Sequence, residues 1–415
     1  MGRGTRGLLG ALAAGLMLSG CWTQIGFGPE RRRYNPFEQG ITPANVDTLA
    51  PLWSVTLPGG MSEPVLAGGR VHVSRTDTTV NSHSVTALDG TTGTILWNRT
   101  LLADSPVAPV SNSVAFSGNE LWGSFAAQTG AALVRLDPQT GATIASEADE
   151  VVLSPVVTGD DVLAYLQLGA TFHDRVLVVR DRTTLATLWT AELTSQPSWL
   201  LISGDRIHLV SSTTVEAYPT DCGASTCAPL WRRELTDGSG INAAALGPDG
   251  EVVTTTAFRF VEDRHGMRFP EPSVLTVSDG ATGITLWSAR VTSLTGGMAI
   301  DDDHIYVSTR EQLDDLGNPL GTYSVTAFAL GGCGTPTCFT GTWSRPLPSV
   351  PGSPLVGGGV VYAGVGSDLH ALATDGTPLA TFLGVGTPRS LGEGRLYTTT
   401  GAADSTSLRA LAPVS

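Results

Sequence analysis

Short runs of alternating apolar and polar residues, separated by turns rich in glycine and aspartate, recur along most of the chain. Alternation with a period of two indicates half-buried β-strands, and the turns between them indicate hairpins. One hairpin pattern is a Gly/Asp turn followed by a β-branched and often aromatic strand. Its eight copies place the first residue after the turn at Val71, Leu121, Val162, Ile207, Val252, Ile305, Val360 and Leu396. The pattern predicts eight antiparallel hairpins.

A second pattern consists of a strand, a turn containing Asp and Gly, and a strand that carries Trp. The clearest copy runs from Ala87 to Trp97, and Asp279 to Trp287 repeats it. Glycine suits such a turn because it adopts positive φ at little cost. The Trp is large enough to fill the gap to a neighbouring sheet. Further copies, some of them degenerate, run from Asp137 to Ala145, from Asp181 to Trp189, up to Trp231, up to Trp343, and from Ala371 to Phe382.

Together the two patterns make units of about 40–50 residues with four strands each, the size of a β-propeller blade. The last unit ends near Ala412 without a fourth strand, and the Trp pattern has one copy too few after residue 60. The stretch Leu52–Leu57 supplies both, because Leu52-Trp53 matches Leu96-Trp97. We therefore expect an all-β, eight-bladed propeller of four-stranded antiparallel blades over residues 41–415, with the ring closed by the N-terminal strand.

The first 20 residues are typical of a signal peptide. Arg3 and Arg6 precede a short apolar stretch that ends at Leu18, too short for a transmembrane helix of about 20 residues. Leu18-Ser-Gly-Cys21 resembles the lipobox of bacterial lipoproteins, in which the cysteine receives a diacylglycerol before cleavage. We expect a lipoprotein signal peptide at 1–20 and lipid attachment at Cys21, and hence export and anchoring at the extracytoplasmic face of a bacterial membrane. The alternative is an ordinary secretory signal with an incidental cysteine.

Residues 21–40 show neither strand nor helix periodicity, and we expect a flexible tether there. The run Arg31-Arg32-Arg33 either contacts anionic lipid head groups or is simply solvated.

Four further cysteines form two pairs with the same spacing, each shortly before a Trp: Cys222 with Cys227, and Cys333 with Cys338. A local disulfide would close each turn, stabilise it by on the order of 2 kcal/mol and fit an oxidising compartment. The alternative is a four-thiolate zinc site, which needs both pairs close together, whereas these occupy equivalent places in two different units. We predict two disulfides.

The composition of the chain and the positions of its polar residues within the repeat exclude several kinds of catalysis and ligand binding. All 24 basic residues are arginine, so mechanisms that need lysine are excluded, and a net charge of −14 argues against a nucleic-acid partner. No Gly-x-Ser-x-Gly motif supports a hydrolase. His72 and His208 fall where other units carry Trp or Tyr, a packing position, and the run Asp301–His304 falls on a turn. We therefore predict no catalytic and no metal-ligating residues.

The repeats, with Ala-x-Asp-x-x-Thr-Gly-x-x-x-Trp at 87–97 as the clearest case, resemble those of pyrroloquinoline-quinone-type β-propellers over residues 41–415. With its lipobox and size, the chain is most similar to the BamB-like bacterial lipoproteins of that family. The resemblance implies a monomeric, non-enzymatic scaffold without a cofactor, which binds an envelope protein or peptide. Quinone-dependent alcohol dehydrogenases of the same family imply the alternative, an oxidoreductase with pyrroloquinoline quinone and calcium. A third possibility is a ligand-sensing propeller that uses its central channel.

Two insertions depart from the repeat, at 258–273 and 310–321, each between the second and third strands of its unit. Such loops often carry recognition, although neutral drift also produces them. The first supplies the predicted partner-binding residues, because aromatic residues and Arg are enriched at interface hot spots. Its arginines suit an acidic partner unless Glu311, Asp314 and Asp315 of the second insertion neutralise them. The predicted partner-binding residues are Phe258, Arg259, Phe260, Arg264, Met267, Arg268 and Phe269.

Overall fold

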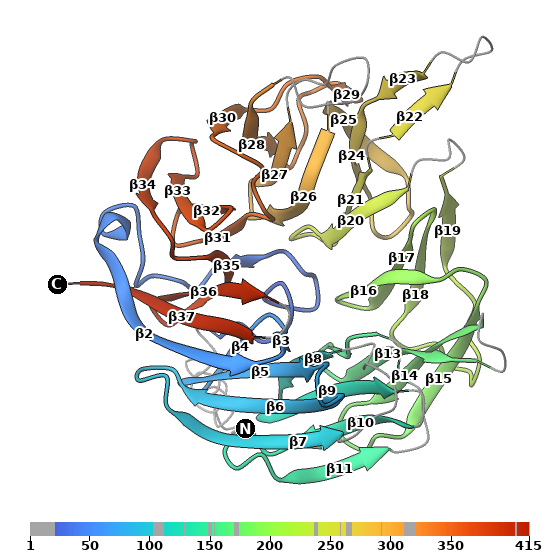
Figure 1. The fold of residues 1–415 in the computed structure, drawn as a ribbon. Coiled ribbons are helices and arrows are strands. Elements are labelled where there is room, and N and C mark those ends of the chain that lie inside the picture. Colours follow the sequence, from blue (N-terminus) through green and yellow to red (C-terminus); the bar gives the residue numbers. More distant parts are fainter. Residues whose placement is uncertain are drawn as a thin grey trace, which may run out of the picture.

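The computed structural model describes residues 21–102, 112–127, 130–147, 152, 154–169, 174–235, 240–257, 259–262, 268–291, 293–310, 321–402 and 405–414. They form eight antiparallel blades of four strands each, arranged in a ring (Figure 1). The first strands of successive blades contact one another in a closed circle, so they lie innermost. The predicted eight-bladed, all-β propeller is confirmed.

The strands follow the chain in order from blade to blade. Blade 1 contains β4 (Val65–Ala67), β5 (Arg70–Asp77), β6 (Ser82–Asp89) and β7 (Ile95–Leu102), with β3 (Gly60–Met61) beside β5. Blade 2 contains β8 (Asn112–Ser117), β9 (Glu120–Ala127), β10 (Gly130–Leu136) and β11 (Thr143–Glu147). Blade 3 contains β12 (Val157–Thr158), β13 (Val162–Leu168), β14 (Arg175–Asp181) and β15 (Thr187–Leu193). Blade 4 contains β16 (Pro197–Ser203), β17 (Arg206–Ser211), β18 (Thr214–Pro219) and β19 (Trp231–Glu234).

The second half continues in the same way. Blade 5 contains β20 (Ile241–Leu246), β21 (Val252–Thr256), β24 (Ser273–Ser278) and β25 (Thr285–Val291). Blade 6 contains β26 (Ser293–Ile300), β27 (His304–Arg310), β28 (Tyr323–Ala329) and β30 (Trp343–Leu347). Blade 7 contains β31 (Leu355–Gly357), β32 (Val360–Val365), β33 (Asp368–Ala373) and β34 (Pro378–Phe382). Blade 8 contains β35 (Thr387–Gly392), β36 (Arg395–Ala402), β37 (Ser405–Pro413) and β2 (Leu49–Pro58). A short 3₁₀ helix, η1 (Val46–Thr48), precedes β2.

The N-terminal strand β2 closes the ring, as expected from the missing last strand. It pairs antiparallel with the C-terminal strand β37, with Trp53 opposite Ala410 (Figure 1). Trp53 is 9% exposed and belongs to a core cluster shared by blades 1, 7 and 8. The two ends of the propeller therefore meet in one blade, and β2 completes blade 8 as its outermost strand.

Tryptophans join successive blades. The Trp of one blade packs against the third-to-fourth-strand turn of the next, where its indole N–H donates to a backbone carbonyl. At the junction of blades 8 and 1, Trp53 Nε1 lies 3.0 Å from the Gly90 carbonyl oxygen. A Cβ atom on Gly93 would lie 2.6 Å from the Trp53 ring, and Gly93 has a φ of 71°, so this turn requires glycine. Five further junctions have the same bond, donated by Trp97, Trp189, Trp231, Trp287 and Trp343.

Two departures from the repeat fall at a single junction. Blade 2 carries Ala145 where other blades have Trp, and blade 3 carries Leu185 where other turns have Gly. Leu185 has a φ of 62° and packs against a cluster containing Trp122 and Tyr165. The lost Trp volume is thus offset by the added Leu volume in the neighbouring blade.

Both predicted disulfides are present, Cys222–Cys227 and Cys333–Cys338. Each disulfide turn lies along the outer strand of the preceding blade. The second turn contains β29 (Thr337–Cys338), which pairs in parallel with β25 of blade 5, while in the first turn Cys227 N–H donates to the Thr190 carbonyl of blade 3. The disulfide turns therefore also cover part of two exposed sheet edges.

Residues 22–35 lie inside the ring, whereas the sequence analysis assigned them to a flexible tether. Their backbone carbonyls accept hydrogen bonds from the inner strands of six blades, and Gln24 and Asn35 bind the remaining two through their side chains. The inner-strand donors, in blade order, are Leu66, Phe116, Ile202, Leu246, Ile300 and Val356. At its end the segment forms β1 (Tyr34–Asn35), parallel to β31. We call residues 22–35 the central segment.

Candidate functional site

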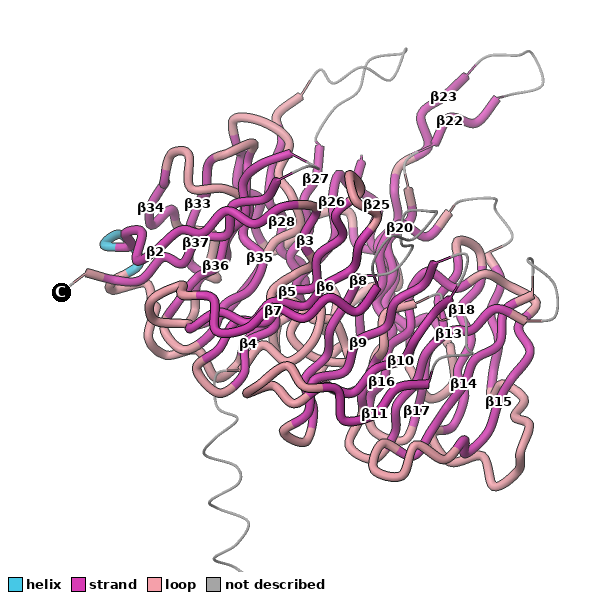
Figure 2. The backbone as a smooth tube through the Cα atoms, turned by 60° about the horizontal axis from the view of Figure 1, so that its bottom comes forward, coloured by secondary structure: helices cyan, strands magenta, loops and turns pink. Residues whose placement is uncertain are grey.

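The two faces of the ring carry different loops. One face, here called the turn face, carries the first-to-second-strand turns and the Asp-Gly and disulfide turns. The other face carries the second-to-third-strand loops and the connections between blades. We call it the ribbon face, because the insertion of blade 5 forms a two-stranded ribbon there, β22 (Arg259–Glu262) and β23 (Arg268–Glu271). This ribbon extends away from the ring (Figure 2).

The register of the ribbon balances its charges. Arg259 pairs with Glu271 and Glu262 pairs with Arg268, so each arginine of β22 and β23 stands opposite a glutamate. Directly opposed unlike charges are favourable in an antiparallel pair. Glu311, Asp314 and Asp315 of the blade 6 insertion, the expected alternative, lie outside the described residues.

The predicted partner-binding residues fall partly on this ribbon. Arg259, Phe260, Arg268 and Phe269 belong to β22 and β23, whereas Phe258, Arg264 and Met267 lie outside the described residues. In the backbone register Phe260 pairs with Pro270 and Phe269 pairs with Val261.

The central segment closes the channel at the turn face. Its carbonyls accept from residues at the ends of the inner strands, where these enter the turns. The cavity left between Gln24, Arg31, Val114 and Val156 measures only about 10 Å³, which is about the minimum for one water molecule. No ligand larger than a water molecule fits in this cavity.

Glu63 holds the central segment to blade 1. Its carboxylate accepts from the Trp22 indole N–H at 2.8 Å, the Gly26 amide at 2.7 Å and the Arg33 guanidinium at 2.8 Å. The Glu63 side chain is 9% exposed and that of Arg33 is 16% exposed. Three charge-assisted bonds to one largely buried carboxylate form a strong, well-satisfied contact.

Arginines dominate the charge around Glu63. Burial lowers the pKa of Arg31 to about 10, against the opposing effect of the Glu63 carboxylate. The pKa of Arg389, on the inner strand of blade 8, is lowered by partial desolvation and then by the positive charge of Arg33. Arg32 instead faces the turn face, where it binds Asp302 at 2.7 Å. Lipid head groups were one expected partner of these arginines, yet Arg32 and Arg33 each pair with a carboxylate of the ring.

The calcium ion of quinone-dependent dehydrogenases does not fit this part of the channel. Calcium requires six to eight oxygen ligands, carboxylates among them. The carboxylate of Glu63 is already bound by three donors, and the cations Arg31, Arg33 and Arg389 lie near it. These positive charges repel a divalent cation.

His72 and His208 occupy packing positions, as expected. Each ring lies beside the Trp of its own blade, with centroid distances of 5.8 Å to Trp97 and 5.9 Å to Trp231. Burial lowers the pKa of His72 to about 4 and also lowers that of His208. Both side chains are therefore neutral core residues at physiological pH.

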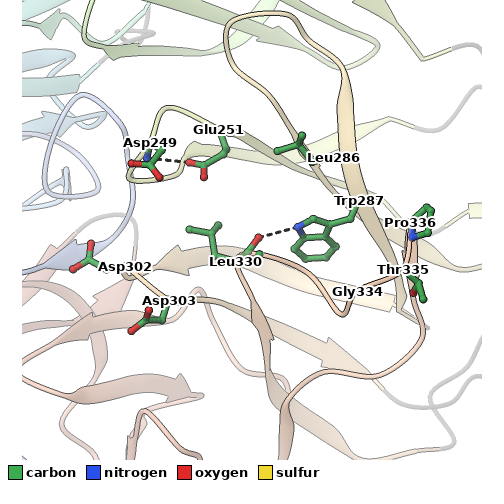
Figure 3. Close-up of a pocket in the computed structure, with 11 residues that line it drawn as sticks. Asp249, Glu251, Leu286, Trp287, Asp302, Asp303, Leu330, Gly334, Thr335 and Pro336 are labelled. Carbon is green, nitrogen blue, oxygen red and sulfur yellow. Dashed lines mark hydrogen bonds between the residues drawn. The ribbon is translucent and has the colours of Figure 1, made fainter.

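An acidic cleft of about 660 Å³ lies between blades 5 and 6 on the turn face (Figure 3). Asp249 and Glu251 line one side and Asp302 and Asp303 the other. The neighbouring Asp301 accepts the Tyr306 hydroxyl at 2.7 Å and the His304 amide at 2.7 Å, so its carboxylate is committed to the turn. The run Asp301–His304 therefore belongs to the turn of this hairpin, as the sequence predicts.

Cys21 lies at the start of the described chain and is buried beside the backbone of Gly68. The next residue, Trp22, already accepts a hydrogen bond from Leu66 of blade 1 at 2.7 Å. The expected signal peptide, residues 1–20, lies outside the described residues. No helix in the part of the chain that the structure describes is long and apolar enough to cross a bilayer.

Eight four-stranded blades, joined by tryptophans that pack on glycine-containing turns, define the chain as an eight-bladed β-propeller. Residues 41–239 match the family model of the outer membrane protein assembly factor BamB. The similarity to this family thus covers blades 1–4. No curated protein sequence matches it.

Solved structures of two kinds resemble the fold. The quinohaemoprotein alcohol dehydrogenase from Comamonas testosteroni has a TM-score of 0.66 at 14% identity, covering 98% of this chain and 82% of that one. A europium-containing methanol dehydrogenase has a TM-score of 0.65 at 13% identity, covering 95% and 98%. BamB from Moraxella catarrhalis has a TM-score of 0.55 at 16% identity, covering 87% and 97%. At these identities the similarity concerns the fold alone.

Proposed function

We propose that the chain is a membrane-anchored, extracytoplasmic propeller that binds another protein of the cell envelope and is not itself an enzyme. The observation that carries this proposal is the ribbon β22–β23, an insertion into the repeat that extends from one face of the ring (Figure 2). The match of residues 41–239 to the BamB family model supports it. So does Cys21 at the end of a lipobox-like sequence.

The ribbon has the properties of a docking element. A two-stranded sheet is only marginally stable in water, so it gains from a further strand or surface. Both outer edges of the β22–β23 sheet lack a neighbouring strand among the described residues. Such edges present backbone donors and acceptors that pair with an added strand. The proposed partner therefore contributes an extended segment to the ribbon, and its side chains contact Phe260 or Phe269.

The anchor and the ribbon lie at opposite faces. Trp22, directly after Cys21, is bound to blade 1 near the turn face, so a lipid on Cys21 would hold that face toward the membrane. The ribbon face would then point away from the membrane and toward a partner in the adjoining compartment. Attachment of the lipid requires the buried Cys21 side chain to turn outward.

Substitution Cys21→Ser tests the anchor. We expect the variant to lose labelling by a radioactive fatty acid and to move from the membrane fraction to the aqueous fraction. The propeller should keep its melting temperature, because serine is similar in size to cysteine. Unchanged labelling and fractionation would remove the anchor from the proposal.

A quinoprotein oxidoreductase remains the second candidate, because two of the similar folds belong to alcohol dehydrogenases. Pyrroloquinoline quinone and calcium added to the purified protein separate the two functions. We expect no calcium-dependent rise in melting temperature and no dye-linked alcohol oxidation, because the arginines around Glu63 repel the calcium ion. Tight binding with turnover of an alcohol would establish the enzyme instead.

A further inference from the structure

A groove of about 270 Å³ lies between the outer strands of blades 5 and 6. It is lined by Arg290 and Val291 of β25, by residues of blade 6, and by Phe339–Gly341 directly after the second disulfide turn. We call it the Phe339 groove, and the acidic cleft of the turn face is lined by different residues. Its volume is below the roughly 300–1,000 Å³ of small-molecule sites, so the groove suits single side chains of a bound polypeptide.

Phe339 stands at the edge of the groove and is 75% exposed. Its backbone is held in two ways, because the preceding Cys338 is joined to Cys333 by the disulfide and pairs with Ala289 of β25. In the disulfide turn of blade 4 the residue after the second cysteine is Ala228 instead. Such a turn therefore does not require an aromatic residue there. An exposed aromatic ring on a fixed backbone has the properties of an interface residue.

The charged residues that line the Phe339 groove are arginines. Arg290 is exposed, on the outer strand of blade 5. The guanidinium of Arg310 lies over the Tyr323 ring, 5.1 Å from its centroid, and Nη2 donates to the Tyr323 hydroxyl at 3.3 Å, so its position is fixed. None of the described residues that line the groove is acidic, although the chain has a net charge of −14. The groove is therefore complementary to carboxylates.

The Phe339 groove adjoins the base of the ribbon. Ser273 of β24, two residues after the end of β23, pairs with Val291 of β25. On its other side, β25 pairs with β29 at Ala289 and Cys338 (Figure 1). Neighbouring strands are about 4.8 Å apart, so roughly 10 Å, two such spacings, separate the disulfide turn from the base of the ribbon. A polypeptide bound to the ribbon can therefore reach the groove along the surface of blade 5.

We propose, on the basis of the proposed function, that the Phe339 groove is a second contact for the envelope partner and binds an acidic segment of it. Arg290 and Arg310 bind carboxylates of this segment, and an apolar side chain of the segment packs against Phe339. The ribbon pairs with backbone and accepts many sequences, whereas the groove selects for charge and apolar content. Two linked contacts on one partner bind more tightly than either contact alone.

Site-specific photocrosslinking in native membranes tests the groove, with the full-length chain carrying p-benzoylphenylalanine in place of Phe339. We expect a light-dependent adduct with the protein that the ribbon recovers, and the crosslinked peptide should contain Asp or Glu beside an apolar residue. Arg290→Glu should reduce the adduct at least about tenfold, because it opposes like charges. The matched control carries the same probe in place of Ala228 and should give no adduct with this protein.

Phe339→Ala separates binding from folding, because it copies the residue of the blade 4 turn. Its melting temperature should equal that of the native protein, while recovery of the partner should fall at least about tenfold. Recovery through the ribbon without an adduct at position 339 would overturn the groove and leave the proposed function standing. An adduct with lipid, with a second copy of the chain or with a segment lacking acidic residues would do the same, as would a lower melting temperature of Phe339→Ala. Failure to recover any partner through the ribbon would contradict the proposed function and the groove together.

Discussion

A chain that begins at Met61 should lose cooperative folding. It lacks β2, so β37 becomes an unpaired edge and the ring is no longer closed. It also lacks Trp53, whose indole fills the junction with blade 1 and bonds to Gly90. Removing a buried Trp alone costs about 3–5 kcal/mol. Since single domains have a total stability of about 5–15 kcal/mol, the further loss of a whole strand should unfold most of the ring.

Urea unfolding followed by circular dichroism measures this effect. A matched chain that begins at Leu49 keeps β2 and lacks the residues before it, among them the central segment and η1. It should remain cooperative with reduced stability, because the freed inner-strand amides then face solvent in the channel. A chain beginning at Met61 that unfolds as cooperatively as the full-length protein would show that β2 does not close the ring.

The blades could be predicted because two residue types define them, glycine in the turn and tryptophan in the outer strand. Glycine acts through its backbone conformation and tryptophan through its side-chain volume, and both properties follow from residue type. Gly93 must be glycine for both its φ and its contact with Trp53, so the Thr-Gly turn and the Trp recur together. Counting these pairs located every blade and the closing strand. The paired departures Ala145 and Leu185 lay in the sequence too, but only the structure shows that they meet at one junction.

The central segment could not be predicted because its contacts are made mainly by backbone carbonyls. Trp22, Thr23, Pro29, Glu30 and Arg32 accept from five different blades, and any residue type provides the same carbonyl. No periodicity arises from such contacts. The sequence nevertheless contains one indication of these contacts, the run Arg31–Arg33, because three adjacent arginines are unusual in so acidic a chain. Their partners, Glu63 and Asp302, are far along the sequence.

The ribbon was expected as a loop, and its strands are short. Its sequence did contain a signal, because Arg259-Phe-Val-Glu262 and Arg268-Phe-Pro-Glu271 share the pattern Arg-Phe-x-Glu. When two such segments pair antiparallel, each arginine stands opposite a glutamate, as the register shows. The shared pattern therefore fits the observed register.

Replacing the ribbon should abolish partner binding without unfolding the propeller. In the variant, residues 257–272 are exchanged for Gly366-Ser367, the tight turn that joins the corresponding strands of blade 7. The strands β21 and β24 stay intact, so the melting temperature should change little. A control, Val80→Ser, alters an exposed residue of blade 1 in its own second-to-third-strand loop.

The direct measurement of the proposed function is crosslinking in native membranes, followed by identification of the proteins recovered with the propeller. We predict a discrete envelope partner with the native chain and with Val80→Ser. Recovery should fall at least about tenfold with the ribbon replacement, since hot-spot contacts are each worth 2 kcal/mol or more. Undiminished recovery from a folded ribbon-replacement variant would contradict the assignment of partner binding to β22–β23.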